Sequence, residues 1–115
     1  MELVALLSTG KGTWAQVAGV INQGEWDKII LIGNEFAKKF SVDKPFEFVQ
    51  ITSQRLVELK EELVKKLKGK INGTEVALSI ASGDGKEHMA LISALLSLPA
   101  GVRFTALTKN GLVML

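Results

Sequence analysis

Two short glycine-rich segments carry the residues best suited to chemistry in this 115-residue chain. The first is Ser8-Thr9-Gly10-Lys11-Gly12-Thr13, and the second is Ser82-Gly83-Asp84-Gly85-Lys86. Each follows an apolar run and leads into a stretch with helical periodicity. Backbone N–H groups at such a strand-to-helix junction attract an anion, and the hydroxyls and lysines add donors and positive charge. The two segments therefore predict a binding site for an anionic group such as a phosphate.

A purely structural role is the competing interpretation of both segments. Gly, Ser and Thr are common at any strand-to-helix turn because they suit turn geometry and helix capping. Asp84 carries a charge that opposes anion binding, so we expect it either to cap the following helix or to bind a ribose hydroxyl. The lysine in each segment favours the binding interpretation.

Three further features are compatible with nucleotide chemistry. Residues 10–15 match the dinucleotide-binding pattern G-x-G-x-x-A, and Glu35 lies 25 positions after Gly10, near the place of a ribose-binding acid. Trp14 could stack on a base, although its spacing suits a core position at least as well. His88 follows the second segment closely enough to donate to a phosphate, although a packing histidine is the more common case. The Walker pattern is absent, which argues against nucleotide hydrolysis of that type.

The amino-acid composition excludes several classes of function for this chain. The chain contains no cysteine and a single histidine, which excludes disulfides, thiolate catalysis and cysteine-rich or multi-histidine metal centres, and we expect neither a metal nor a cofactor. A net charge of +2 falls short of the basic stripe of a duplex-binding protein. No apolar run reaches the roughly 20 residues that span a bilayer. The first residues lack the basic region of a signal peptide, so we expect a cytoplasmic protein without membrane contact.

The spacing of apolar residues predicts alternating strands and helices along the whole chain. Continuous apolar runs predict strands, and apolar residues at spacings of three and four predict helices. Asn110-Gly111 predicts a hairpin turn near the end of the chain. The expected strands are residues 3–7, 28–32, 46–51, 75–81, 103–109 and 112–115, and the expected helices are residues 14–24, 35–40, 53–68 and 86–98.

The expected fold class is α/β, a Rossmann-like three-layer fold with a mainly parallel sheet and a C-terminal antiparallel hairpin, formed by residues 1–115 as a single domain. Strands that are apolar throughout are typical of parallel sheets covered by helices on both faces. We expect the terminal hairpin to add antiparallel strands at one edge. In the common doubly wound order, the first and fourth strands are neighbours at the point where strand order reverses, and ligands bind there. The two glycine-rich segments are therefore expected to face one another.

The same two segments resemble the CARF family, the CRISPR-associated Rossmann-fold domains. LVALLSTGKGTW is similar to the family's loop after the first strand, and VALSIASGDGKEHMALISALLSLP is similar to its glycine-rich turn after the fourth strand. The layout of strand–helix units and a closing hairpin is also similar, so the resemblance covers nearly the whole chain. The sequence departs from the family at Asp84-Gly85, where the turn is more acidic, and the chain is shorter than most members, without an attached effector domain.

The resemblance implies a homodimer that binds a cyclic oligoadenylate second messenger across its two-fold axis. Several standalone family members are ring nucleases, in which a ribose 2′-hydroxyl attacks its adjacent phosphate without a metal. The family chemistry then implies catalytic roles for Lys86, which would stabilise charge, and for Ser8 or Thr9, which would orient the ribose. At the matching positions, the implied ring contacts are Ser8, Thr9 and Gly10 from the first segment, Gly83, Gly85 and Lys86 from the second, and Gly33-Asn34 at an adenine.

Two alternatives are open at this point. The chain could be a stand-alone dinucleotide- or nucleotide-binding Rossmann domain, which the G-x-G-x-x-A pattern favours. It could also be a non-catalytic regulatory dimer whose glycine-rich segments are only turns. The sequence specifies neither the size of a bound ring nor whether the ring is cut.

Overall fold

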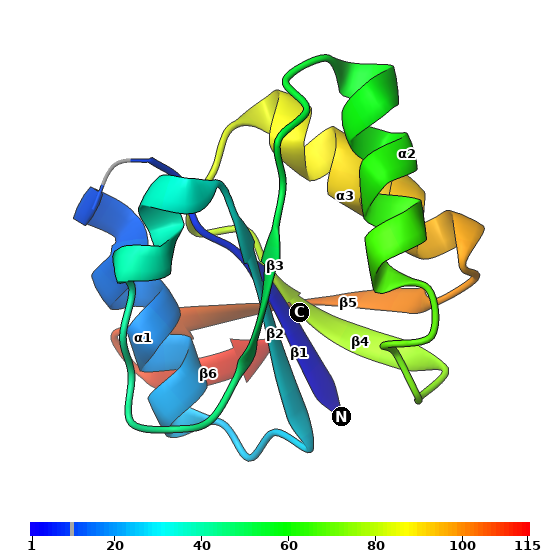
Figure 1. Ribbon diagram of the computed structural model, residues 1–115. Helices are drawn as coiled ribbons and strands as arrows, with labels where there is room; N and C mark the ends of the chain where they lie inside the picture. The colour runs from blue at the N-terminus through cyan, green and yellow to red at the C-terminus, as the bar shows by residue number, and fades with distance from the viewer. Residues whose placement is uncertain (10) are drawn as a thin grey trace.

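One sheet with the strand order β3-β2-β1-β4-β5-β6 runs through the computed structural model, which describes residues 1–9 and 11–115 (Figure 1). Neighbouring strands are parallel from β3 through β5, and β6 is antiparallel to β5. The strands are β1 (Glu2–Leu6), β2 (Lys28–Gly33), β3 (Glu47–Gln50), β4 (Glu75–Ser79), β5 (Gly101–Thr108) and β6 (Gly111–Met114). The predicted α/β class, the mainly parallel sheet and the terminal hairpin are confirmed.

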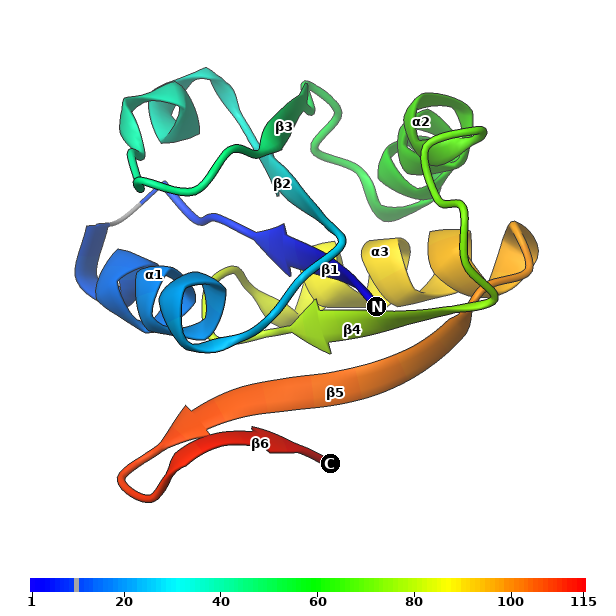
Figure 2. The same cartoon turned by 90° about the horizontal axis from the view of Figure 1, so that it is seen from below.

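Helices cover both faces of this sheet (Figures 1 and 2). On one face lie the short 3-10 helix η1 (Lys11–Thr13), α1 (Trp14–Gln23) and the 3-10 helix η2 (Glu35–Lys39). On the other face, α2 (Leu56–Leu67) packs beside α3 (Gly85–Ser97). The result is the three-layer arrangement that the sequence predicted.

The two cores are filled by alternate residues of the same strands. Val4 and Leu6 of β1 pack toward α2 and α3, whereas Leu3 and Ala5 pack toward α1. Successive side chains of a strand point to opposite faces, so a strand that is buried on both faces must be apolar throughout. All five residues of β1 are buried, and this explains its continuous apolar run apart from Glu2.

The hairpin differs from expectation in one respect. Its first strand, β5, pairs in parallel with β4, with Val76 opposite Val102. Helix α3 returns the chain to the amino edge of the sheet, so β5 begins there and continues the parallel series. Only β6 reverses direction, after the turn at Asn110.

The fourth strand ends at Ser79, two residues earlier than expected, and Ile80 and Ala81 lie outside the sheet. Figure 2 shows β5 continuing well past the end of β4. Among the described residues, no helix has the length and apolar character that a bilayer crossing requires.

Candidate functional site

The loops that follow β1 and β4 are joined at the point where the strand order reverses. Strand β1 pairs with β2 on one side and with β4 on the other. The hydroxyl of Ser82, which is fully buried, accepts a hydrogen bond of 2.8 Å from the backbone N–H of Ser8. It accepts a second bond of 2.8 Å from the hydroxyl of Thr13. The two glycine-rich segments therefore meet as the sequence predicted, and a serine hydroxyl holds them together.

The peptide groups of Ser8 are fixed on both sides. Its N–H donates to Ser82, and its carbonyl accepts a bond of 3.1 Å from the indole Nε1 of Trp14. Trp14 is 8% exposed and packs against Phe36 and Phe40, with ring centroids 5.7 and 5.8 Å apart. Trp14 is therefore a core residue that anchors the first loop.

The second loop is shaped by a left-handed glycine and a helix cap. Gly83 has a φ of +102°, and a Cβ at this position would lie 2.6 Å from Leu6 Cδ2. Asp84 accepts a bond of 2.7 Å from the N–H of Glu87, and the Glu87 carboxylate accepts one of 2.9 Å from the N–H of Asp84. This reciprocal arrangement is a capping box. The prediction that Asp84 caps the following helix is confirmed.

The lysine of the second loop reaches a neighbouring segment of the chain. Lys86 is exposed, and its ammonium donates to the carbonyl of Gln54, in the segment that precedes α2. Gly10 and the side chain of Lys11 lie outside the described residues. Thr9 is exposed, and no atom of the described residues lies within 4 Å of the position that a Cβ would take at Gly12 or at Gly85. The backbone at both glycines is therefore open to a ligand.

Gly33 and Asn34, at the carboxyl end of β2, have structural roles. The side-chain oxygen of Asn34 accepts a bond of 3.3 Å from Ala37 N–H and caps η2. A Cβ at Gly33 would lie 2.5 Å from the Cβ of Ala37, so a glycine is needed for η2 to pack against β2. The sequence did not reveal this use of the pair.

Two buried polar groups near the joined loops lack a hydrogen-bond partner among the described residues. They are the imidazole of His88, about one turn into α3, and the hydroxyl of Ser79, which is 1% exposed at the end of β4. Burial lowers the pKa of His88, and the backbone of Ser82 and the charges of Glu87 and Asp84 oppose this effect only in part. Burial therefore favours the neutral form of the imidazole. The sequence analysis named His88 as a candidate, but nothing in the sequence distinguished Ser79 from the other residues of its apolar strand.

The segment that Lys86 contacts is held in place by Glu62 of α2. The Glu62 carboxylate accepts bonds from Ser53 N–H at 2.9 Å, Thr52 N–H at 3.1 Å and the Lys66 ammonium at 2.7 Å. Burial alone would raise the pKa of Glu62, but the bonds from Lys66, Ser53 and Thr52 outweigh it and lower the pKa to about 2. Glu62 thus fixes the backbone between β3 and α2.

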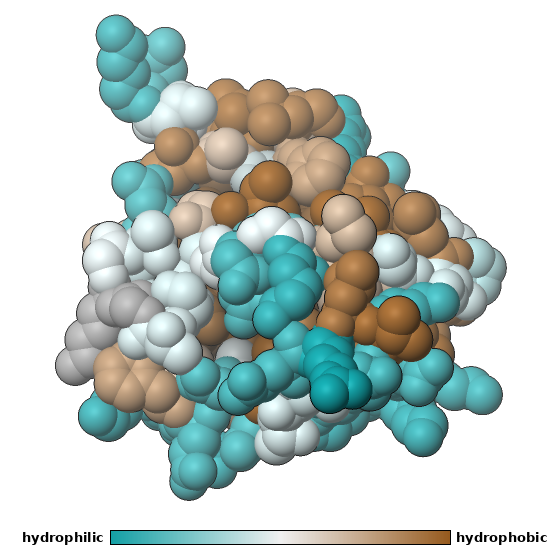
Figure 3. All heavy atoms as spheres, turned by 90° about the horizontal axis from the view of Figure 1, so that it is seen from above, coloured by the Kyte–Doolittle hydropathy of each residue, from teal (hydrophilic) through white to brown (hydrophobic). Residues whose placement is uncertain are grey.

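A groove of about 370 Å³ opens beside the joined loops, between α1 and β5. Its wall contains Ile80 and Ala81, the two residues that lead directly into Ser82. Figure 3, which views the carboxyl edge of the sheet, shows apolar side chains gathered along one border of this face. The lining residues are Gln16, Ile80, Ala81, Phe104, Thr105, Ala106, Leu107 and Leu115. The sequence did not reveal this groove, because its walls come from segments far apart in the chain.

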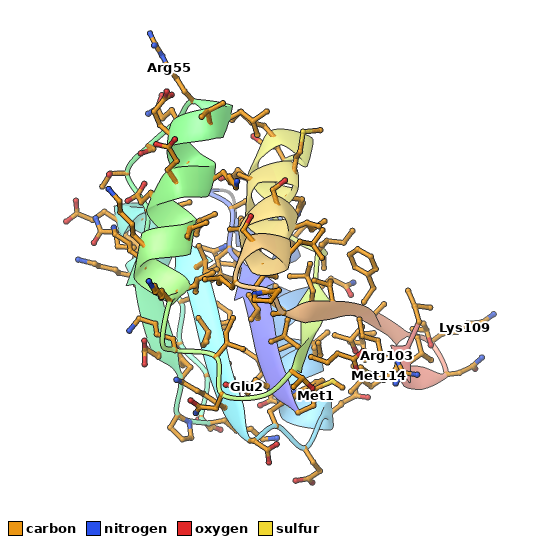
Figure 4. The ribbon with its side chains drawn as sticks, turned by 90° about the vertical axis from the view of Figure 1, so that its right-hand side faces the viewer. Met1, Glu2, Arg55, Arg103, Lys109 and Met114 are labelled. Atoms are coloured by element: carbon orange, nitrogen blue, oxygen red, sulfur yellow. The ribbon has the colours of Figure 1, made fainter. Side chains whose placement is uncertain are left out.

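A second hollow, of about 480 Å³, lies at the opposite, amino edge of the sheet, where Met1 and Glu2 appear in Figure 4. The buried carboxylate of Glu2 accepts bonds from Gly73 N–H at 2.7 Å and from Asn72 N–H at 3.0 Å. The amino group of Met1 pairs with Asp27. These contacts anchor the loop before β4 and indicate a structural role for this edge. No cluster of three metal-ligating side chains occurs in the described part of the chain.

Comparison of the sequence with protein-family models and with curated proteins finds no match. Its strand order and its mainly parallel sheet alone place the chain among the Rossmann-like α/β folds.

Proposed function

We propose that this protein binds a cyclic oligoadenylate at the carboxyl edge of its sheet, as a homodimer, and cleaves the bound ring without a metal. The observation that supports this best is the pair of hydrogen bonds by which Ser82 joins the loops after β1 and β4. Ligands of open parallel sheets bind at this switch point. The specific ligand comes from the resemblance of these loops to the CARF family.

An anionic ligand suits the joined loops for electrostatic reasons. The starts of η1–α1 and of α3 lie at the same edge, and helix starts present unpaired N–H groups and the positive end of the helix dipole. Open space at Gly12 and Gly85 lets a large ligand approach the backbone. The carboxylate of Asp84 caps the start of α3 and offsets part of its positive end, so its charge opposes an anion on that side of the site.

Cleavage requires few groups from the protein. The ribose 2′-oxygen bonds to the adjacent phosphorus while the bond to the 5′-oxygen breaks. The 2′-hydroxyl gives its proton to water and the 5′-oxygen takes one from water, which leaves a 2′,3′-cyclic phosphate and a 5′-hydroxyl. The protein must hold the ribose in line and stabilise the charge on the phosphate oxygens. The side-chain hydroxyl of Ser8 suits the first task, because the backbone that carries it is fixed by bonds to Ser82 and Trp14. Lys86 suits the second after its exposed ammonium leaves the Gln54 carbonyl, an exchange that costs little at the surface.

Two identical subunits are proposed because a cyclic ligand is itself rotationally symmetric. An isologous dimer presents the joined loops twice around one axis, and a symmetric ring can then make the same contacts with each subunit. A cytoplasmic location, where such messengers act in this family, belongs to the same proposal.

Thermal shift with cyclic tetra-adenylate, cyclic hexa-adenylate and NAD in parallel tests the ligand class. A ligand at 100 times its Kd stabilises the folded state by about 2.7 kcal/mol, a shift of several degrees for a domain of this size. A shift with a cyclic oligoadenylate supports the proposal. A rise in Tm with NAD alone supports the dinucleotide-binding alternative. No change in Tm with any of the three ligands favours the alternative in which the glycine-rich segments are only turns.

Two substitutions assign the residues. Lys86→Ala should weaken both binding and cleavage, whereas Lys109→Ala, at the exposed hairpin tip, should change neither (Figure 4). Ser8→Ala should keep its affinity while cleavage slows. If Lys86→Ala binds the ring as well as the wild type does, Lys86 is not part of the site. If Ser8→Ala loses binding and cleavage equally, Ser8 does not act by orienting the ribose.

A further inference from the structure

We propose that the groove between α1 and β5 is a subsite for a purine base. This inference rests on the proposed function, since the base would belong to the nucleotide whose phosphate lies at the joined loops. The wall residues Ile80 and Ala81 lead directly into Ser82. Consecutive Cα atoms are about 3.8 Å apart, so the wall begins within roughly 8 Å of the Ser82 backbone. A base in the groove and a phosphate at the loops can therefore belong to one nucleotide.

The lining of the groove suits the flat apolar faces of a base. Ile80 is 46% exposed and Leu115 is 74% exposed, so two large apolar side chains border the groove in contact with water. Phe104 and Leu107 contribute further apolar surface from β5. A planar ligand that covers these side chains removes apolar surface from water, which is favourable.

The edge of the groove suits the polar rim of a base. Strand β4 pairs with β5 only as far as Phe104, while β5 continues to Thr108, so within residues 1–9 and 11–115 no strand lies beside the last part of β5 on that side. The N–H of Leu115 donates to Phe104 O at 2.8 Å, so Phe104 faces β6. Peptide groups alternate along an antiparallel pair, which turns those of Leu107 away from β6, toward the side on which β4 has already ended. A strand edge thus offers both donors and acceptors.

The amide of Gln16 adds one more donor and acceptor pair. Gln16 is exposed in the first turns of α1 and lines the groove. Glutamine and asparagine amides match the paired donor and acceptor of adenine. A purely apolar ligand would leave these polar groups without partners, so the groove favours a purine. By contrast, the side-chain oxygen of Asn34, at the end of β2, already caps η2.

The test combines one ligand without phosphate and a pair of cyclic ligands of equal charge. Adenosine is titrated into the full chain while amide NMR signals are followed, and the affinities of cyclic tetra-adenylate and cyclic tetra-uridylate are measured by calorimetry. The variants are Ala81→Trp, which fills the groove from an exposed position, and Gln16→Ala. Their matched controls are Leu96→Trp, on the exposed side of α3, and Gln23→Ala, at the far end of α1.

The proposal predicts that adenosine shifts the amide signals of residues 80–81 and 104–107. Gln16→Ala should weaken cyclic tetra-adenylate binding roughly three- to tenfold, as expected for one hydrogen bond, with little effect on cyclic tetra-uridylate. Ala81→Trp should weaken it at least about tenfold, as expected when a stacked base loses its place. Both controls should bind like the wild type.

The failures of the two proposals are distinguishable. If cyclic tetra-adenylate binds but adenosine shifts signals elsewhere and the groove variants bind normally, the groove proposal is overturned and the proposed function stands. If adenosine shifts the groove signals but no cyclic oligoadenylate binds, the subsite stands and the proposed ligand is wrong. If the amide signals of the groove residues change with protein concentration but not with adenosine, the groove is occupied by a second copy of the chain. That result overturns the proposal.

Discussion

Replacement of Ser82 by alanine tests whether one hydroxyl holds the candidate site together. The Ser82 hydroxyl is fully buried and accepts hydrogen bonds from Ser8 N–H and from the Thr13 hydroxyl, each at 2.8 Å. In Ser82→Ala the N–H of Ser8 loses its acceptor in a partly buried place, while the half-buried Thr13 hydroxyl can turn toward water. The variant should therefore weaken both stability and ligand binding.

The magnitude follows from the cost of an unsatisfied buried donor. Such a group costs about 1–3 kcal/mol, and this is the expected loss in the free energy of unfolding. For a domain of about 100 residues each kcal/mol lowers Tm by roughly 4 °C, so Tm should fall by roughly 4–12 °C. Urea unfolding followed by circular dichroism should give a lower midpoint with an unchanged slope. Ser41→Ala, in an exposed loop, is the control and should stay within about 0.5 kcal/mol of the wild type.

A double-mutant cycle isolates the bond between the two loops. Thr13→Val removes the donor, and its effect should shrink when Ser82 is already alanine, with a coupling energy of about 0.5–1.5 kcal/mol. Additivity within about 0.3 kcal/mol, together with a Ser82→Ala stability equal to that of the control, would refute the reasoning. The two loops would then be neighbours without being joined.

Three further predictions concern the residues that shape the site. Glu62→Gln should lower the free energy of unfolding at pH 7 by on the order of 1–3 kcal/mol and flatten the acid limb of a Tm–pH profile. The pKa of Glu62 in the folded state, about 2, lies below the unfolded value of 4.5. The stability that Glu62 contributes is therefore complete above pH 4.5 and is lost as the pH falls toward 2. An unchanged acid limb contradicts this role. Asp84→Ala should cost about 1 kcal/mol in urea unfolding through loss of the cap, and Asp84→Ser should restore part of it; equal stability of both variants argues against capping. Gly83→Ala should cost about 1–3 kcal/mol because its φ is +102° and Leu6 lies in the way, so a variant as stable as the wild type in thermal unfolding contradicts the strained turn.

The fold could be predicted because its signals are local. Continuous apolar runs such as residues 28–32 mark strands buried on both faces, and Asn110-Gly111 marks the hairpin turn. The parallel direction of β5 was missed because it depends on α3 returning the chain across the sheet, which no local pattern shows. The early end of β4 was missed because Ile80 remains apolar although it leaves the sheet to line a groove.

The candidate site could be predicted only as a pair of segments. Fold topology brought residues 8–9 and 11–13 to the same edge as residues 82–86, as expected. The hydrogen bond from Lys86 to Gln54 and the groove beside Gln16 depend on side-chain placement across elements that are distant in sequence. Likewise, the unpartnered hydroxyl of Ser79 becomes visible only when its surroundings are known.

The most direct test of the account is incubation of the purified protein with radiolabelled cyclic tetra-adenylate in EDTA, followed by native and denaturing gels. We expect a retarded complex and linear products that end in a 2′,3′-cyclic phosphate. A retarded ring that stays uncut would refute cleavage and leave a sensor. Neither a complex nor a product, at protein concentrations well above those of the ring, would contradict the central claim.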